Sequence, residues 1–143
     1  MAQLNPYLTF NGNCETAFKF YRSVFGGEFQ QIMRFKDMPP MPGQEIRERD
    51  KERIMHVALP ISKETILMGS DSNPNMGEFK GQNVSLSVIT SSKEEANKIF
   101  ARLSEGGKVT MPLADQVWNS YFGMVTDLFQ TTWMISYDYP KKD

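Results

Sequence analysis

The first half of this sequence repeats the plan of the second half, and this repeat restricts the possible folds more than any other feature. In each half a short apolar segment leads through a polar turn into an amphipathic segment that ends at two glycines. Two copies of one strand–helix–strands unit are therefore predicted, and two such units can enclose a shared cleft. Five residue pairs match at an offset of 79 positions: Glu15 with Glu94, Ala17 with Ala96, Phe20 with Ile99, Tyr21 with Phe100, and Val24 with Leu103.

Hydrophobic periodicity predicts one helix and four strands in each half, which gives the order βαβββ twice and an α+β fold class. Asn13 is the expected N-cap of the first helix, and Gly26-Gly27 is its expected stop. The expected buried stripe of that helix is Ala17, Phe18, Phe20, Tyr21, Val24 and Phe25. The predicted strands are 7–10, 29–35, 54–61 and 65–71 in the first half, and 84–89, 108–112, 121–126 and 132–137 in the second, with the second helix at about 92–104.

The length and composition predict a single domain over residues 1–143. Its first unit covers about 4–71, a linker about 72–82, and its second unit about 83–138. With 143 residues and 40% hydrophobic side chains, the chain can build one core. Cys14 is the only cysteine, so no internal disulfide is possible.

Charge and hydropathy exclude two kinds of partner. The 16 basic and 17 acidic side chains form no basic stripe, which argues against nucleic acid. No apolar run reaches the length of a membrane helix, and the N-terminus lacks a signal-peptide pattern, so a soluble cytoplasmic protein without membrane contact is expected.

Residues 37–53 differ from the rest of the first half, because a proline-rich stretch precedes a run of alternating charges. The prolines argue against a central strand. Two interpretations stay open: a mobile flap over a binding site, or a solvated loop that leads to an edge strand.

The predicted segments carry a set of motifs that extends over nearly the whole chain. The motifs are Pro6-Tyr7-Leu8, Gly12-Asn13-Cys14-Glu15, Phe20-Tyr21, Phe25-Gly26-Gly27, Met55-His56, residues 67–71, residues 106–113, Trp118, Phe122-Gly123 and Trp133-Met134-Ile135. As a set, they resemble the vicinal oxygen chelate superfamily of glyoxalases, bleomycin-resistance proteins and dioxygenases, and more narrowly its PhnB-like branch. The resemblance implies that each unit curls into a half-barrel that is completed across a homodimer.

The resemblance also implies where a metal ion would bind. Metalloenzymes of this superfamily hold a divalent ion with His, Gln or Glu on the first and last strand of each unit. The corresponding positions here are Pro6, Met68, Asn83 and Met134. Proline and thioether groups are unsuitable ligands for hard or borderline divalent ions. Neighbouring positions do not restore a ligand set, so neither a metal site nor a cofactor is expected. Those neighbours are Tyr7, Leu8, Gly69, Ser85 and Ser136.

Without a metal site, few side chains of this sequence are candidates for catalysis or ligand contact. His56 is the only histidine, and strand alternation places it opposite the helix-packing face; it is a candidate catalyst, ligand contact or packed residue. Cys14 is interpreted as a packing residue or as a thiol activated by the helix dipole. Asp71 and Asp127 follow strands, where hydrogen bonds to turn amides are favoured over an acid–base pair.

The expected ligand site is the cleft face of both sheets, opposite the helices. Val84, Leu86 and Val88 should pack on the second helix, which leaves the serines of that strand on the cleft side. Trp118, Tyr121 and Phe122 form an aromatic platform at the rim, or else pack in the core or in a dimer. The expected site residues are His56, Met68, Ser85, Ser87, Trp118, Met134 and Ser136.

The predicted function is metal-free binding of a small molecule of unknown identity, the mode that the resemblance to bleomycin-resistance proteins implies. The alternative is a metal-dependent lyase or dioxygenase with an atypical site. A methyltransferase, a label that this branch often carries, is rejected because the chain has no Gly-rich strand-to-helix loop for a nucleotide-like cofactor. A homodimer is expected as well, since each half-barrel leaves open sheet edges.

Overall fold

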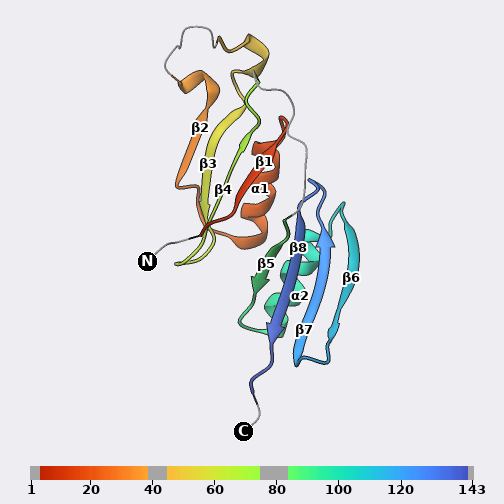
Figure 1. The fold of residues 1–143 in the computed structure, drawn as a ribbon. Helices are drawn as coiled ribbons and strands as arrows, with labels where there is room; N and C mark the ends of the chain where they lie inside the picture. The colour runs from red at the N-terminus through yellow and green to blue at the C-terminus, as the bar shows by residue number, and fades with distance from the viewer. Residues whose placement is uncertain (1–3, 39–44, 75–83, 142–143) are drawn as a thin grey trace. The chain divides into compact units, whose positions relative to one another are not determined.

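The computed structural model describes residues 4–38, 45–74 and 84–141, and it divides the chain into two compact units. Unit 1 covers residues 1–81 and unit 2 covers residues 82–143. Each unit contains one long helix and one four-stranded sheet, so the predicted α+β class with two βαβββ repeats is confirmed. Figure 1 shows the two units and the order of their elements.

Unit 1 has the strand order β1-β4-β3-β2. The first strand pairs with β4 in parallel, and the other neighbours are antiparallel. Two short 3-10 turns follow β2 and precede β3. The elements are β1 Tyr7–Phe10, α1 Cys14–Phe25, β2 Gln31–Arg34, η1 Phe35–Asp37, η2 Glu48–Asp50, β3 Ile54–Pro60 and β4 Ile66–Asp71.

Unit 2 repeats this topology with the strand order β5-β8-β7-β6. Its first strand again pairs in parallel with its last strand, and β6, β7 and β8 are antiparallel neighbours. The predicted internal repeat is therefore present in the strand topology. The elements are β5 Leu86–Ile89, α2 Lys93–Leu103, β6 Lys108–Asp115, β7 Ser120–Thr126 and β8 Thr132–Asp138.

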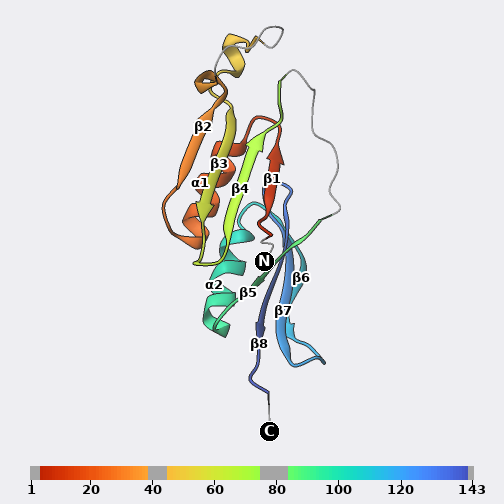
Figure 2. The ribbon, with the colours of Figure 1, turned by 60° about the vertical axis from the view of Figure 1, so that its left-hand side comes forward.

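Each helix packs on one face of the sheet in its own unit, as Figures 1 and 2 show. A glycine on the sheet permits the close approach in both cases. A Cβ on Gly69 of β4 would lie 2.7 Å from the ring of Phe18, and a Cβ on Gly123 of β7 would lie 2.9 Å from the ring of Phe100. Any side chain at either position would push the helix away from the sheet. No helix within the described residues is long and apolar enough to cross a membrane.

Two expectations about the buried residues are wrong. Phe20 and Phe25 of α1 are only half-buried, because the helix contacts its sheet through a narrower stripe that includes Cys14. Val84 is 68% exposed and does not pack on α2. It precedes β5, which begins at Leu86, so the strand ladder does not hold it against the helix.

The carboxylate of Asp71 takes the capping role that the sequence assigned to Asn13. Asn13 is the N-cap of α1, but its side chain makes no capping hydrogen bond. Asp71 Oδ1 instead accepts hydrogen bonds from the N–H groups of Gly12 (2.8 Å) and Cys14 (3.0 Å). Its Oδ2 accepts one from Ile54 N–H at 2.9 Å, and the residue is only 3% exposed. One carboxylate thus joins the ends of β4, α1 and β3.

Asp127 has a similar role in the turn between β7 and β8. Its Oδ1 accepts hydrogen bonds from the N–H groups of Phe129 (2.8 Å) and Thr131 (3.0 Å). Its Oδ2 accepts one from the indole Nε1–H of Trp133 at 2.8 Å. Both aspartates bind turn amides, so the interpretation that favoured hydrogen bonding over acid–base chemistry agrees with the structure.

The charged end of segment 37–53 is held against η1, the 3-10 turn that follows β2. Lys36 Nζ lies 2.7 Å from Glu52 Oε1, and the Lys36 N–H donates to the Lys51 carbonyl at 3.1 Å. Phe35 N–H donates to the Arg53 carbonyl at 3.0 Å. The tip of the predicted flap, residues 39–44, lies outside the described residues.

We expect Asp71→Ala to destabilise the protein by about 2–4 kcal/mol, because three N–H donors lose their acceptor in a buried environment. Chemical denaturation followed by circular dichroism measures this change. Glu94→Ala, on the exposed side of α2, is the control and should change the free energy of unfolding by less than about 0.5 kcal/mol. Equal stability of Asp71→Ala and the wild type would contradict the proposed capping role.

Candidate functional site

The sheet of unit 1 has one face that α1 does not cover, called here the helix-free face of unit 1. Directly paired residues point to the same side of a sheet, and successive residues alternate. Gly69 pairs with Leu8 and Val57 and lies under the helix. The residues next to them therefore point away from it. They are Tyr7 and Thr9 of β1, Met68 and Ser70 of β4, His56 and Ala58 of β3, and Met33 of β2.

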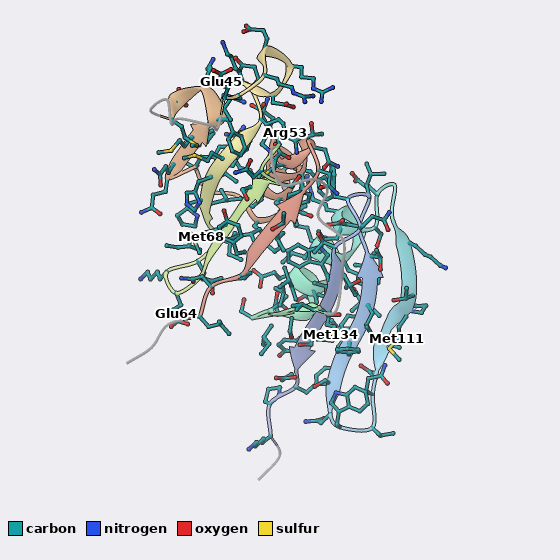
Figure 3. All side chains as sticks on the ribbon, turned by 45° about the horizontal axis from the view of Figure 1, so that its top comes forward. Glu45, Arg53, Glu64, Met68, Met111 and Met134 are labelled. Carbon is teal, nitrogen blue, oxygen red and sulfur yellow. The ribbon has the colours of Figure 1, made fainter. Side chains whose placement is uncertain are left out.

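His56 lies at the centre of this face. It pairs with Met33 on β2, and its ring stacks on Tyr7 of β1 with centroids 5.9 Å apart and an interplanar angle of 28°. Tyr7 in turn pairs with Met68 of β4, and it is 49% exposed. The predicted position of His56 opposite the helix is therefore correct. The helix-free face of unit 1 therefore carries one imidazole, one phenol ring and two thioethers. Figure 3 labels Met68, one of the two methionines.

Unit 2 has an equivalent helix-free face. Gly123 lies under Phe100 of α2 and pairs with Ile135, which fixes the helix side of β7 and β8. The alternate residues point the other way. They are Phe122 and Met124 of β7, Met134 and Ser136 of β8, Ser87 and Ile89 of β5, and Met111 of β6.

Trp118 lies next to Phe122 at one end of the helix-free face of unit 2. It lies in the turn between β6 and β7, is 56% exposed, and meets the edge of the Phe122 ring at a centroid distance of 5.9 Å. Ser136, which pairs with Phe122, is 8% exposed. Ser85 is exposed but precedes β5, so no strand pairing fixes its direction.

The structure thus groups the predicted site residues by unit. His56 and Met68 share the helix-free face of unit 1, and Ser87, Met134 and Ser136 share that of unit 2, with Trp118 at its end. Sequence reasoning missed Tyr7, Met33, Met111 and Met124 as members of these faces. Strand alternation was the available signal, but only the pairing register shows which strands are neighbours.

Tyr121 belongs to the helix side and not to a platform with Trp118. Its hydroxyl donates a hydrogen bond to Asn97 Oδ1 of α2 at 2.6 Å, and the ammonium of Lys93 lies 4.6 Å from its ring centroid. A hydrogen bond between the hydroxyl of Tyr139 and Asp115 raises the pKa of that tyrosine. This exposed cluster joins α2 to the sheet.

Cys14 does not have the properties of a reactive thiol. The residue is completely buried at the start of α1. Burial, and then the negative charges of Asp71 and Glu15, raise its pKa far above the usual range. These effects outweigh the helix dipole, so the thiol stays protonated and packs as a small apolar group.

A salt bridge links α1 to β2. The guanidinium of Arg34 binds both carboxylate oxygens of Glu15, at 3.0 and 2.7 Å, and its Nη1 also donates to the Glu52 carbonyl. The hydrogen bond from Arg34 lowers the pKa of Glu15. This pair lies on the helix side, so it supports the fold and leaves the helix-free face without a charged contact from Arg34.

Arg53 occupies another polar cluster, at the start of β3 (labelled in Figure 3). Its Nη2 donates to the carbonyl and the hydroxyl of Ser72, both at 3.0 Å, and its Nη1 lies 3.8 Å from Asp50 Oδ1. Among the described residues, its buried Nε finds no hydrogen-bond partner. The cluster connects the 3-10 turn before β3 to the segment after β4.

The residues present do not fit the divalent metal site that the resemblance implies. Met68 and Met134 contribute thioethers, Pro6 contributes no side-chain donor, and Asn83 lies outside the described residues. Within the described ranges, no group of three or more His, Cys, Asp or Glu side chains could hold a metal ion. The donor set of both faces suits neither a zinc nor an iron site.

Comparison with known proteins agrees with this architecture. The sequence matches the Glyoxalase/Bleomycin resistance protein/Dioxygenase superfamily over residues 3–135. Protein YjdN of Escherichia coli (strain K12) is 31% identical over 140 residues, which cover 93% of each chain. The crystal structure of protein PA1353 from Pseudomonas aeruginosa is similar with a TM-score of 0.85 and 38% identity, covering 96% of this chain and 98% of that chain.

A more distant structure shares the fold. The PhnB protein from Bacillus cereus, described as a putative 3-demethylubiquinone-9 3-methyltransferase, has a TM-score of 0.73 and 24% identity, and the match covers 95% of this chain and 99% of that chain. The family match confirms the resemblance to the superfamily, and a PhnB protein is among the structural neighbours. The family match and the sequence relatives cover nearly the whole chain, and the two repeats have the same strand order. This chain belongs to the glyoxalase/bleomycin resistance protein/dioxygenase superfamily.

Proposed function

We propose that this chain binds a small organic molecule without the help of a divalent metal ion, and that the helix-free faces of its sheets supply the binding surface. The observation that carries the proposal is the chemistry of these faces. At two of the positions where the resemblance places the His, Gln or Glu ligands of metalloenzymes, this chain has the thioethers of Met68 and Met134. Aromatic and hydroxyl groups lie beside them on the same faces. The site residues are His56, Met68, Ser85, Ser87, Trp118, Met134 and Ser136.

The side chains of the helix-free faces indicate what kind of small molecule could bind there. Methionine side chains are flexible and polarisable, so they adapt to apolar ligands of different shapes. Tyr7 and Trp118 are 49% and 56% exposed and can stack on an aromatic ring. His56 and the serines provide a few polar contacts. A small, weakly polar, partly aromatic molecule fits this surface better than a highly charged one.

A chelator-treated sample should not bind Zn²⁺, Ni²⁺, Fe²⁺ or Mn²⁺ in stoichiometric amounts, because the donor set lacks the required carboxylates and imidazoles. A thermal melt with and without each ion measures the effect, since an ion that binds the folded state raises the melting temperature. Stoichiometric uptake that is lost in His56→Ala or Asn83→Ala would show instead that the protein holds a divalent ion in an atypical site, as the enzyme alternative requires.

A thermal-shift screen of small aromatic compounds should find stabilising ligands. Trp118→Ala should weaken a ligand of the helix-free face of unit 2, and His56→Ala a ligand of the helix-free face of unit 1, each by about 1–3 kcal/mol. The loss of a stacking surface or of a buried hydrogen bond accounts for this magnitude. Isothermal titration calorimetry measures the affinity. Val117→Ala, in the same turn and fully exposed, is the matched control and should bind as the wild type does. Unchanged affinity in both site variants would place the ligand elsewhere.

We further propose that the protein is a homodimer at micromolar concentration. Within each four-stranded sheet, β1 and β2 or β5 and β6 form the two edges. Unpaired strand edges favour association with another chain, and a two-fold axis satisfies both copies at once. Sedimentation equilibrium should therefore give twice the chain mass of 16.4 kDa. The chain mass itself, unchanged as the concentration rises, is the result that would exclude the dimer.

A further inference from the structure

Three methionines lie side by side across three neighbouring strands on the helix-free face of unit 2. Met111 of β6 pairs with Met124 of β7, and Met124 pairs with Met134 of β8. Directly paired residues point to the same side of a sheet, so the three thioethers form one line across the strands. We call these three residues the methionine row; Figure 3 labels its two outer members. Ser87 of β5 continues the line beyond Met134.

An irregularity in β6 creates this alignment. Between the pairs Val109–Val125 and Met111–Met124, β6 contains one residue more than β7. Without this shift Thr110, not Met111, would lie opposite Met124. A second irregularity follows between Met111 and Ala114. Bulges of this kind redirect a side chain and are over-represented next to functional sites.

The methionine row is not part of the packed core. Among the described residues the buried hydrophobic core contains no methionine. Met111 is 38% exposed, and Met124 and Met134 are half-buried. The opposite side of the same strands buries Val125 and Ile135 completely. Packing against α2 therefore does not explain the row, and all three of its residues are at least partly exposed.

The row can bring its sulfur atoms to one point. Neighbouring Cβ atoms in a directly opposed pair are about 5 Å apart. The methionine side chain has three rotatable bonds and no branch, so the outer thioethers can turn towards the central one. Three soft donors can then surround a single ion above Met124.

The surroundings of the row select the type of ion. The next residues on the same face are Phe122 and Thr126 on β7 and Thr132 and Ser136 on β8. They supply an aromatic ring and hydroxyl groups but no carboxylate, whereas Ca²⁺ and Mg²⁺ need several oxygen ligands, and carboxylates above all. Thioethers favour Cu(I) among the common biological metals.

We infer that the methionine row is a binding site for a soft monovalent metal ion, Cu(I) or its redox-inert analogue Ag(I). The row Met111–Met124–Met134 supplies three neutral thioether ligands, and the ion keeps its own positive charge. This site goes beyond the proposed organic ligand and does not depend on it. The described part of unit 1 has no equivalent row, because Met33 and Met68 lie on β2 and β4 with β3 between them.

The test is a titration of the whole protein with silver nitrate in chloride-free buffer, with the methionine methyl groups labelled with ¹³C. The methyl signals of Met111, Met124 and Met134 should shift together and saturate at one Ag(I) per chain. Met124→Leu should weaken the affinity at least about tenfold, since one of three soft ligands is lost. Leucine has nearly the same volume, so the circular dichroism spectrum should stay native.

Met33→Leu is the matched control and should bind Ag(I) as the wild type does. Met134→Leu is the second row variant and should show the same loss as Met124→Leu, which keeps the test decisive if one variant folds poorly. Wild-type affinity in the folded row variants, or binding that disappears in Cys14→Ala, would overturn the inference, because the ion would then bind elsewhere or at the thiol. A negative result leaves the organic-ligand proposal intact, since Trp118→Ala reports on that proposal separately.

Discussion

A single buried carboxylate determines how unit 1 is assembled. Asp71 lies at the end of β4 and accepts hydrogen bonds from Gly12, Cys14 and Ile54, so it holds the start of α1 and the start of β3 together. The first N–H groups of a helix have no partner within the helix, and here a residue 57 positions away along the chain supplies the acceptor. This contact fixes the start of α1 relative to the sheet, and Gly69 lies under the ring of Phe18 from the same helix.

Unit 2 reaches the same topology with different contacts. The N-cap of α2 is Ser92, whose side chain accepts the Glu95 N–H at 3.0 Å within the helix itself. The buried carboxylate of Asp127 acts in the turn between β7 and β8, where Gln130 adopts a positive φ of 75°. The two repeats therefore share strand order and helix position, while the polar groups that support them differ. Topology depends on the hydrophobic pattern, which both halves keep, and less on any particular hydrogen bond.

Membership of the superfamily establishes the architecture, but the side chains on the helix-free faces determine the chemistry. A divalent-metal enzyme needs carboxylates or imidazoles that converge on one point. The faces described here carry thioethers, aromatic rings and hydroxyl groups, with His56 as the single imidazole. Such surfaces suit apolar ligands, and the three methionines that pair across the strands of unit 2 suit a soft ion. Both properties follow from which residues point away from the helices.

The sequence by itself determined the repeat, the fold class, the order of the elements and the side of the strand on which His56 lies. These features depend on hydrophobic periodicity, which is local and can be read along the chain. Only the tertiary structure decided which residues are neighbours across strands. The capping of α1 by Asp71, the stacking of His56 on Tyr7 and the alignment of Met111 with Met124 all join residues far apart in sequence or depend on a bulge. Pairing register follows from the packing of whole strands, and a shift of one residue changes every contact, so local patterns could not predict these sites.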